Sequence, residues 1–144
     1  MKDLENLQLE LKKKILTAQQ KKLNNFSLGL RGETIACEYL QQHNFQILDR
    51  NSRVNNNEID IIALDQVKNE IVFIEVKTRK SSLFGTPALA VSNKKLRSMV
   101  LVARNYLRQY HCNLDYRFDI IAICYLGNTQ SKPQIEHFEN ISWP

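Results

Sequence analysis

Two short apolar segments of this chain are each interrupted by a carboxylate at a position that should face a hydrophobic core. Strand alternation places Asp60 on the same side as Ile62, and it places Glu75 on the same side as Phe73. An ionised carboxylate is costly there because burial removes its hydration. A chain that keeps both acids therefore needs a shared proton or a bound cation to offset their charge.

The spacing of the two segments predicts a hairpin that brings the carboxylates together. Pairing Leu64 with Ile71 leaves a short loop over residues 65–70 and places Asp60 directly opposite Glu75. Side chains at such positions have Cβ atoms about 5 Å apart. A slip of one residue would turn the apolar side chains to the wrong face, which limits how far this register can move.

Two further side chains join this acidic pair. Lys77 shares the strand face of Glu75, and on a helical wheel Glu33 lies in the apolar sector whereas Glu38 points away. Each acid taken alone is more often a salt-bridged or boundary residue. Three inward acids together with one lysine are better explained by a site for a hard cation with oxygen ligands, Mg²⁺ or Mn²⁺. Such a site suits phosphodiester hydrolysis.

Hydrophobic periodicity predicts an α/β fold with a mixed sheet, because short turns join the middle strands and a helix precedes the next strand. The glycine loops of dinucleotide and P-loop sites are absent from the sequence. The expected elements are helices over 2–25, 28–43 and 88–110, strands over 45–50, 58–64, 70–78 and 117–125, a loop over 81–87 and an edge strand over 134–138. We divide the chain into a Lys-rich helical extension, residues 1–27, and one domain, residues 28–144.

Basic residues are concentrated in one part of the chain. Residues 77–117 hold nine Lys and Arg and one acid, a net charge of +8, which leaves −3 for the rest of a chain whose total is +5. Arg97, Arg104 and Arg108 fall on the far side of their helix from its apolar stripe. We name these three residues the arginine ridge. It suits a polyanion such as nucleic acid, and the alternative is a solubilising helix face.

The length and composition fit one globular domain. The chain has 144 residues, 43% of them hydrophobic, and its longest apolar run is the seven residues 120–126, far below the roughly 18 that a membrane span needs. A Lys-rich polar N-terminus is unlike a signal peptide. We therefore expect a cytoplasmic protein without a membrane partner. The three cysteines are widely scattered and are expected to be reduced thiols.

A longer pattern spread over residues 29–141 resembles the bacterial YraN family, a branch of the PD-(D/E)XK nuclease superfamily. That superfamily includes restriction endonucleases and archaeal Holliday-junction resolvases. The matching residues are Gly29-x-x-Gly32-Glu33-x-x-Ala36-x-x-Tyr39-Leu40, Arg50-Asn51-x-Arg53, Glu58-Ile59-Asp60, Phe73-Ile74-Glu75-Val76-Lys77-Thr78-Arg79, Phe84-Gly85-x-Pro87, Ala90-Val91, Lys95 and Arg117-Phe118-Asp119.

The resemblance implies a restriction-endonuclease-like αβββαβ core with a mixed central sheet flanked by helices. It also implies that Asp60 and Glu75 bind Mg²⁺ or Mn²⁺ together with the main-chain carbonyl of Val76. In this reading Lys77 is the catalytic lysine and Glu33 is an auxiliary acid on the first core helix. Two positions depart from the family pattern. Asn44 and Asn57 stand where the family usually has glycine, and asparagine tolerates positive φ better than most residues.

The expected partner is nucleic acid, and the expected activity is metal-dependent cleavage of DNA, directed by DNA structure more than by sequence. The residues expected to contact the nucleic acid are Arg79, Lys94, Lys95, Arg97, Arg104 and Arg108. For Lys95 a surface lysine lying along the apolar face is the competing reading. Asp119 is read as structural support, and the alternative is that it supports the ligands of the site. The rival function is a non-catalytic nucleic-acid or protein-binding module that keeps the nuclease fold, and an RNA-directed enzyme is a third. Junction-cleaving relatives act as dimers, but the sequence identifies no dimer surface.

Overall fold

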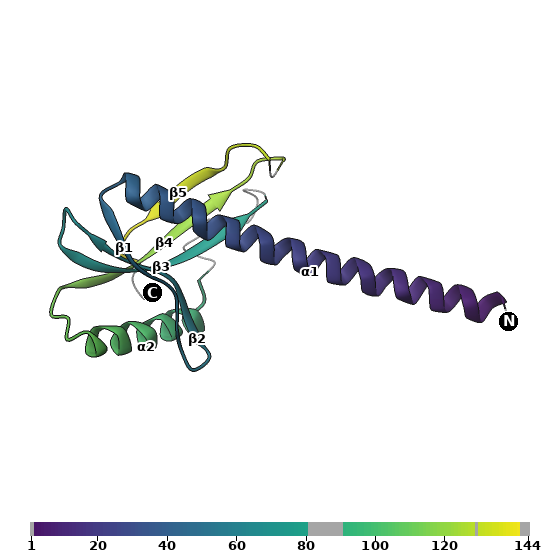
Figure 1. The fold of residues 1–144 in the computed structure, drawn as a ribbon, viewed down its shortest axis with the longest axis horizontal. Coiled ribbons are helices and arrows are strands. Elements are labelled where there is room, and N and C mark those ends of the chain that lie inside the picture. Colours follow the sequence, from purple (N-terminus) through teal and green to yellow (C-terminus); the bar gives the residue numbers. More distant parts are fainter. Residues whose placement is uncertain (1, 81–90, 129, 142–144) are drawn as a thin grey trace. The chain divides into compact units, whose positions relative to one another are not determined.

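The computed structural model describes residues 2–80, 91–128 and 130–141, with side chains from residue 8 onward. The chain divides into two compact units, residues 1–31 and 32–144. Its elements are α1 (Lys2–Gln42), β1 (Phe45–Val54), β2 (Asn57–Asp65), β3 (Glu70–Arg79), α2 (Asn93–Gln109), β4 (Tyr116–Cys124) and β5 (Gln134–Phe138), labelled in Figure 1. Within the described residues, no helix combines the length and the apolar character that crossing a membrane requires.

One continuous helix, α1, replaces the two helices expected over residues 2–43. The expected break between two helices is wrong because residues 26–27 contain neither proline nor glycine, and the two glycines farther along, Gly29 and Gly32, lower helix stability without ending the helix. The C-terminal end matches expectation. Asn44 follows the helix with a φ of 63°, the left-handed conformation that asparagine adopts more readily than most residues.

The five strands form one mixed sheet in the order β1-β2-β3-β4-β5. Neighbouring strands are antiparallel except β3 and β4, which run parallel and are connected through α2. The predicted α/β class, its mixed sheet and its edge strand over residues 134–138 are confirmed. The architecture is consistent with a restriction-endonuclease-like fold.

The predicted register of β2 and β3 is confirmed. Leu64 pairs with Ile71, and the ladder runs on to Ile61 opposite Ile74. The preceding turn differs in one detail from the sequence expectation. Val54 pairs with Asn57, so the turn consists of Asn55 and Asn56, and it is Asn55 rather than Asn57 that takes positive φ.

The two sheet faces are covered by different helices (Figure 1). On one face, buried side chains of α2 pack against β2 and β3 in a core that contains Ile62, Phe73 and Met99. The opposite face is covered by residues 32–42 of α1. There Gly32 lies against Thr78 so closely that a Cβ atom on residue 32 would overlap the threonine Oγ1, which explains a glycine inside this helix.

Helix α2 begins later than the sequence indicated. Ser92 is its N-cap, with Oγ accepting a 3.1 Å hydrogen bond from the main-chain N–H of Lys95. Val91 and Ser92 therefore precede the helix, whereas the loop expected over 81–87 and the expected helix start at 88–90 lie outside the described residues. The sequence predicts an apolar stripe on this helix made of Leu96, Met99, Val100, Ala103, Tyr106, Leu107 and Tyr110. In the structure Val102 is also fully buried, and Tyr110 is 60% exposed.

A buried ion cluster ties β4 to the neighbouring elements. The guanidinium of Arg117 donates hydrogen bonds to Asp119 Oδ1 and Asp65 Oδ2, both at 3.0 Å, and to Glu70 Oε2 at 2.6 Å. Asp119 is fully buried and lies 2.8 Å from His137 Nε2 on β5. These contacts support the structural reading of Asp119, because the side chains in the cluster come from β2, β3, β4 and β5.

Candidate active site

The pairing of β2 with β3 ends at Ile61 and Ile74, and Asp60 and Glu75 lie one residue beyond this last pair. The strands separate there. The main-chain N–H of Val76 donates a 2.7 Å hydrogen bond to Asp60 Oδ2 in place of a bond between two peptide groups. Since the N–H and C=O of one strand residue face the same neighbouring strand, the Val76 carbonyl also faces β2. The two carboxylates and the expected carbonyl ligand thus share one end of the hairpin.

The electrostatic surroundings of Asp60 oppose its ionisation. Burial, followed by the negative charge of Glu75, raises the pKa of Asp60 to about 7. The charge of Glu33 acts in the same direction, while the hydrogen bond from Val76 and the positive charge of Lys95 lower the pKa. The register predicted from the sequence also places the negative charge of Glu75 beside Asp60.

Glu75 is held between two ammonium groups. Its side chain is only 6% exposed, with Lys77 Nζ 3.1 Å from Oε1 and Lys95 Nζ 2.8 Å from Oε2. Oε2 accepts no well-aligned hydrogen bond within the described part of the chain. The contact with Lys95 is therefore mainly a charge attraction at short distance. Lys95 Nζ also donates a 3.1 Å hydrogen bond to the main-chain carbonyl of Glu58.

Asn51 connects Glu33 to the acidic end of β2. It lies between the pairs Arg50–Ile61 and Ser52–Ile59, and it stands opposite Asp60 with a φ of 52°. With its amide nitrogen facing the two carboxylates, Asn51 donates to Glu33 Oε2 at 3.1 Å and to Glu58 Oε1 at 3.2 Å. Glu33 is half-buried and is joined to the site through this amide.

The donor set fits a metal of the Mg²⁺ type with few protein ligands. In residues 2–80, 91–128 and 130–141, no group of three or more His, Cys, Asp or Glu side chains is arranged to hold a metal ion. Mg²⁺ is commonly bound by only one or two carboxylates, with water and substrate phosphate oxygens completing its shell. Asp60 and Glu75 supply two carboxylates, and Oε2 of Glu75 has no well-aligned hydrogen bond in the described residues, although the Lys95 ammonium group lies 2.8 Å from it.

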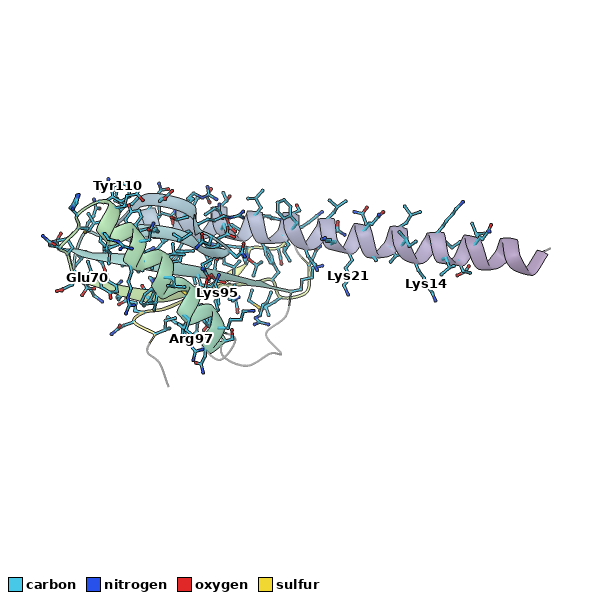
Figure 2. All side chains as sticks on the ribbon, turned by 90° about the horizontal axis from the view of Figure 1, so that it is seen from below. Lys14, Lys21, Glu70, Lys95, Arg97 and Tyr110 are labelled. Atoms are coloured by element: carbon cyan, nitrogen blue, oxygen red, sulfur yellow. The ribbon has the colours of Figure 1, made fainter. Side chains whose placement is uncertain are left out.

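The expected nucleic-acid contacts divide into two groups. Lys94 and the arginine ridge are exposed on α2. Lys95 instead lies against the carboxylates, and Figure 2 shows Lys95 beside the sheet and Arg97 pointing outward from the same helix. Arg79 is half-buried at the end of β3, where its main-chain carbonyl accepts a hydrogen bond from the N–H of Tyr125.

Sequence reasoning missed the placements of Asn51 and Glu58 and the ion pair between Lys95 and Glu75. Asn51 could have been found, because continuing the strand pairing past a two-residue turn places it opposite Asp60. The Lys95 contact depends on how α2 crosses the sheet, and no local pattern encodes that crossing.

Comparison with known proteins places the chain in a family. The model of the family described as "Uncharacterised protein family UPF0102" matches residues 32–123. A UPF0102 protein of Geobacter metallireducens is 44% identical over 119 residues, covering 82% of this chain and 93% of its own length. UPF0102 proteins of Phocaeicola vulgatus and Rhodococcus opacus are 39% and 41% identical, covering 81% and 79% of this chain and 92% and 94% of their own lengths. The chain, which the sequence resemblance grouped with YraN proteins, belongs to the UPF0102 family.

Proposed function

We propose that this protein is a divalent-metal-dependent endonuclease of the PD-(D/E)XK type that hydrolyses DNA phosphodiester bonds. The observation that carries the proposal is the meeting of Asp60 and Glu75 at one end of the β2–β3 hairpin, with Lys77 bound to Glu75. Like charges placed this close destabilise a fold unless cations offset them, and acids with strongly shifted pKa values are concentrated at functional sites.

Asp60, Glu75 and the Val76 carbonyl would hold Mg²⁺ or Mn²⁺. When bound, the ion would supply positive charge to the phosphate and would favour ionisation of the attacking water. The protein residues around it have separate tasks. Lys77 keeps Glu75 in place and positions an ammonium group beside the phosphate. Glu33, held by Asn51, adds an acceptor on the side of α1 that faces Asp60.

The exposed cations of α2 would bind the DNA backbone. Lys94 and the arginine ridge carry no acidic partner in the described ion pairs and hydrogen bonds, so their charge faces solvent. Phosphate contacts position a duplex without reading its sequence, and each one makes binding more sensitive to salt. Replacing Arg104 with Met should reduce the slope of log affinity against log salt by about 1 for every DNA sequence tested.

A binding module without catalysis is the second candidate. It is favoured by one observation: Glu75 already has an ammonium group at each oxygen, so its charge is compensated without a metal ion. Under this reading the arginine ridge would bind nucleic acid and the carboxylates would be structural.

The deciding experiment is cleavage of linear, single-stranded, flapped and four-way DNA with Mn²⁺, alongside RNA of matching sequence. Asp60→Asn and Glu75→Gln should abolish cleavage, whereas Asp115→Asn, at an exposed acid, should not. Asp60→Asn is nearly isosteric and keeps an oxygen for the Val76 N–H, so its effect reports the lost charge. Equal rates for the parent and Asp60→Asn would reject the nuclease assignment, and DNA binding without cleavage by the parent would favour the module.

A further inference from the structure

Lys95 differs from the other cations at the start of α2. Lys94 and Arg97 are exposed, whereas the Lys95 side chain is 27% exposed and reaches Glu75. The N-cap at Ser92 fixes the backbone from which Lys95 extends, because Ser92 Oγ accepts the N–H of Lys95 itself. Figure 2 shows that Lys95 and Arg97, two residues apart, lie on different sides of the helix.

Two ammonium groups already compensate the Glu75 charge before any metal binds. Asp60 and Glu75 contribute two potential negative charges, and Lys77 and Lys95 contribute two positive charges. A divalent cation that uses Glu75 must therefore approach an oxygen that already faces an ammonium group. The ammonium group and the divalent ion compete for this oxygen, because two cations at one carboxylate oxygen repel each other.

Of the two lysines, Lys95 is the one whose contact is more easily exchanged. Lys77 lies two residues from Glu75 on the same strand, so its ammonium group stays close whatever binds. Lys95 extends from a different element, and the oxygen that it faces accepts no well-aligned hydrogen bond in the described part of the protein. A flexible four-carbon side chain allows the ammonium group to move without moving α2.

We propose that Lys95 occupies the cation position at Glu75 in the metal-free protein and yields it to the divalent ion. Its ammonium group then binds a phosphate of the nucleic acid beside the same site. This inference rests on the proposed function, because it assumes a metal ion at Glu75 and a phosphate substrate. It makes Lys95 a positioning residue before metal binding and a phosphate contact afterwards.

The test is calorimetric titration of the full chain with Mg²⁺ in the absence of DNA. Lys95→Met should bind Mg²⁺ about three- to tenfold more tightly than the parent, because the competing ammonium group is gone. Lys95→Arg keeps the charge and should bind Mg²⁺ much as the parent does. Lys94→Met removes the same charge from the adjacent exposed position and should change Mg²⁺ affinity less than about twofold.

A second measurement separates exchange from simple support. At saturating Mg²⁺, single-turnover cleavage by Lys95→Met should be about tenfold slower or worse, because the phosphate contact is lost. Tighter metal binding combined with slower cleavage is not expected of a residue that only holds Glu75 or the Glu58 carbonyl in place. Circular dichroism checks that each variant folds, and Lys95→Gln is used if Lys95→Met does not.

Unchanged or weaker Mg²⁺ binding by Lys95→Met would overturn the exchange. It would leave the proposed nuclease standing if the parent still cleaves DNA. If Lys95→Met binds Mg²⁺ more tightly but the parent cleaves no substrate, the exchange is supported and the nuclease assignment is rejected. If neither the parent nor Lys95→Met binds Mg²⁺, the exchange at Lys95 fails, whereas the nuclease proposal is decided separately by the cleavage assay with Mn²⁺.

Discussion

The carboxylate of Asp60 accepts a 2.7 Å hydrogen bond from the main-chain N–H of Val76, at the point where β2 and β3 separate. A side chain therefore satisfies a backbone donor that the neighbouring strand leaves unpaired. The same carboxyl group is half-buried beside Glu75, and its loss of hydration together with the charge of Glu75 raises its pKa to about 7. One residue thus both completes the hairpin and adds electrostatic strain to it.

Asp60→Asn should stabilise the metal-free protein at alkaline pH. An Asp has a pKa near 3.9 in an unfolded chain, so the raised pKa makes folding take up a proton between about pH 4 and 7. The parent accordingly loses stability as pH rises through this range. The variant should gain about 1–3 kcal/mol in unfolding free energy at pH 8 and little at pH 4.5.

Urea unfolding in the presence of EDTA at the two pH values measures this difference. Asp115→Asn, at an exposed position, is the control and should follow the parent at both. A gain of equal size at pH 4.5 and pH 8 would show that the effect does not come from ionisation of Asp60.

Gly32→Ala should destabilise the protein because a Cβ atom at residue 32 meets the Thr78 side chain. Either the helix or the strand must shift, at a cost of about 1–3 kcal/mol. Gly29→Ala provides a matched comparison within the same helix, since a Cβ atom there meets no atom within 4 Å. It should stabilise the helix by up to about 1 kcal/mol. Urea unfolding of both variants tests the pair, and similar changes in both would contradict the close contact at Thr78.

Arg117→Met should be strongly destabilising, since it leaves Asp65 and Asp119 buried without their cation. Removing one partner of a buried ion pair typically costs about 3–5 kcal/mol. Arg104→Met removes an exposed arginine and should change the free energy of unfolding by less than about 0.5 kcal/mol. A small effect of Arg117→Met in urea unfolding would mean that the cluster is solvated in solution.

The same ion cluster should make the protein lose stability in acid. Burial alone would raise the pKa of Asp65, but the N–H groups of Lys68 and Val67 and the guanidinium of Arg117 outweigh burial and lower it. Its stabilising contribution is therefore complete above the unfolded pKa near 4 and disappears as pH falls through the lower folded value. Unfolding free energies measured from pH 5 to pH 2.5 should fall less steeply for Asp65→Asn than for the parent. Equal slopes would assign the acid sensitivity to other carboxyl groups.

The fold could be predicted where one local pattern decides the outcome. The register of β2 and β3 follows from the alternation around Leu64 and Ile71, because only one pairing places both apolar sets on the same face. The boundary of α1 could not be predicted in this way. Residues 25–28 contain no proline or glycine that would end a helix, so α1 continues through them.

The candidate site was predictable in its acids and less so in its contacts. Asp60, Glu75 and Lys77 can be recognised from the amino-acid sequence alone because they interrupt apolar strands. The position of Lys95 depends on where α2 lies over the sheet, and the Ser92 cap that begins this helix was not recognised. Asn51 carries no charge and breaks no apolar run, so only the completed pairing of β1 with β2 reveals its place.

Strand β2 carries an acid near each end, Asp60 half-buried and Asp65 buried, and the two have opposite consequences for the free energy of the native state. Asp65 is compensated by Arg117 and supports folding, whereas Asp60 is crowded by Glu75 and opposes it. Loss of the Asp60 charge with its oxygen retained, as in Asp60→Asn, would therefore leave the architecture intact and more stable. A chain without the proposed nuclease activity would therefore still fold with asparagine at this position, so persistence of an acid at position 60 among UPF0102 proteins would point to the proposed chemistry rather than to a structural need.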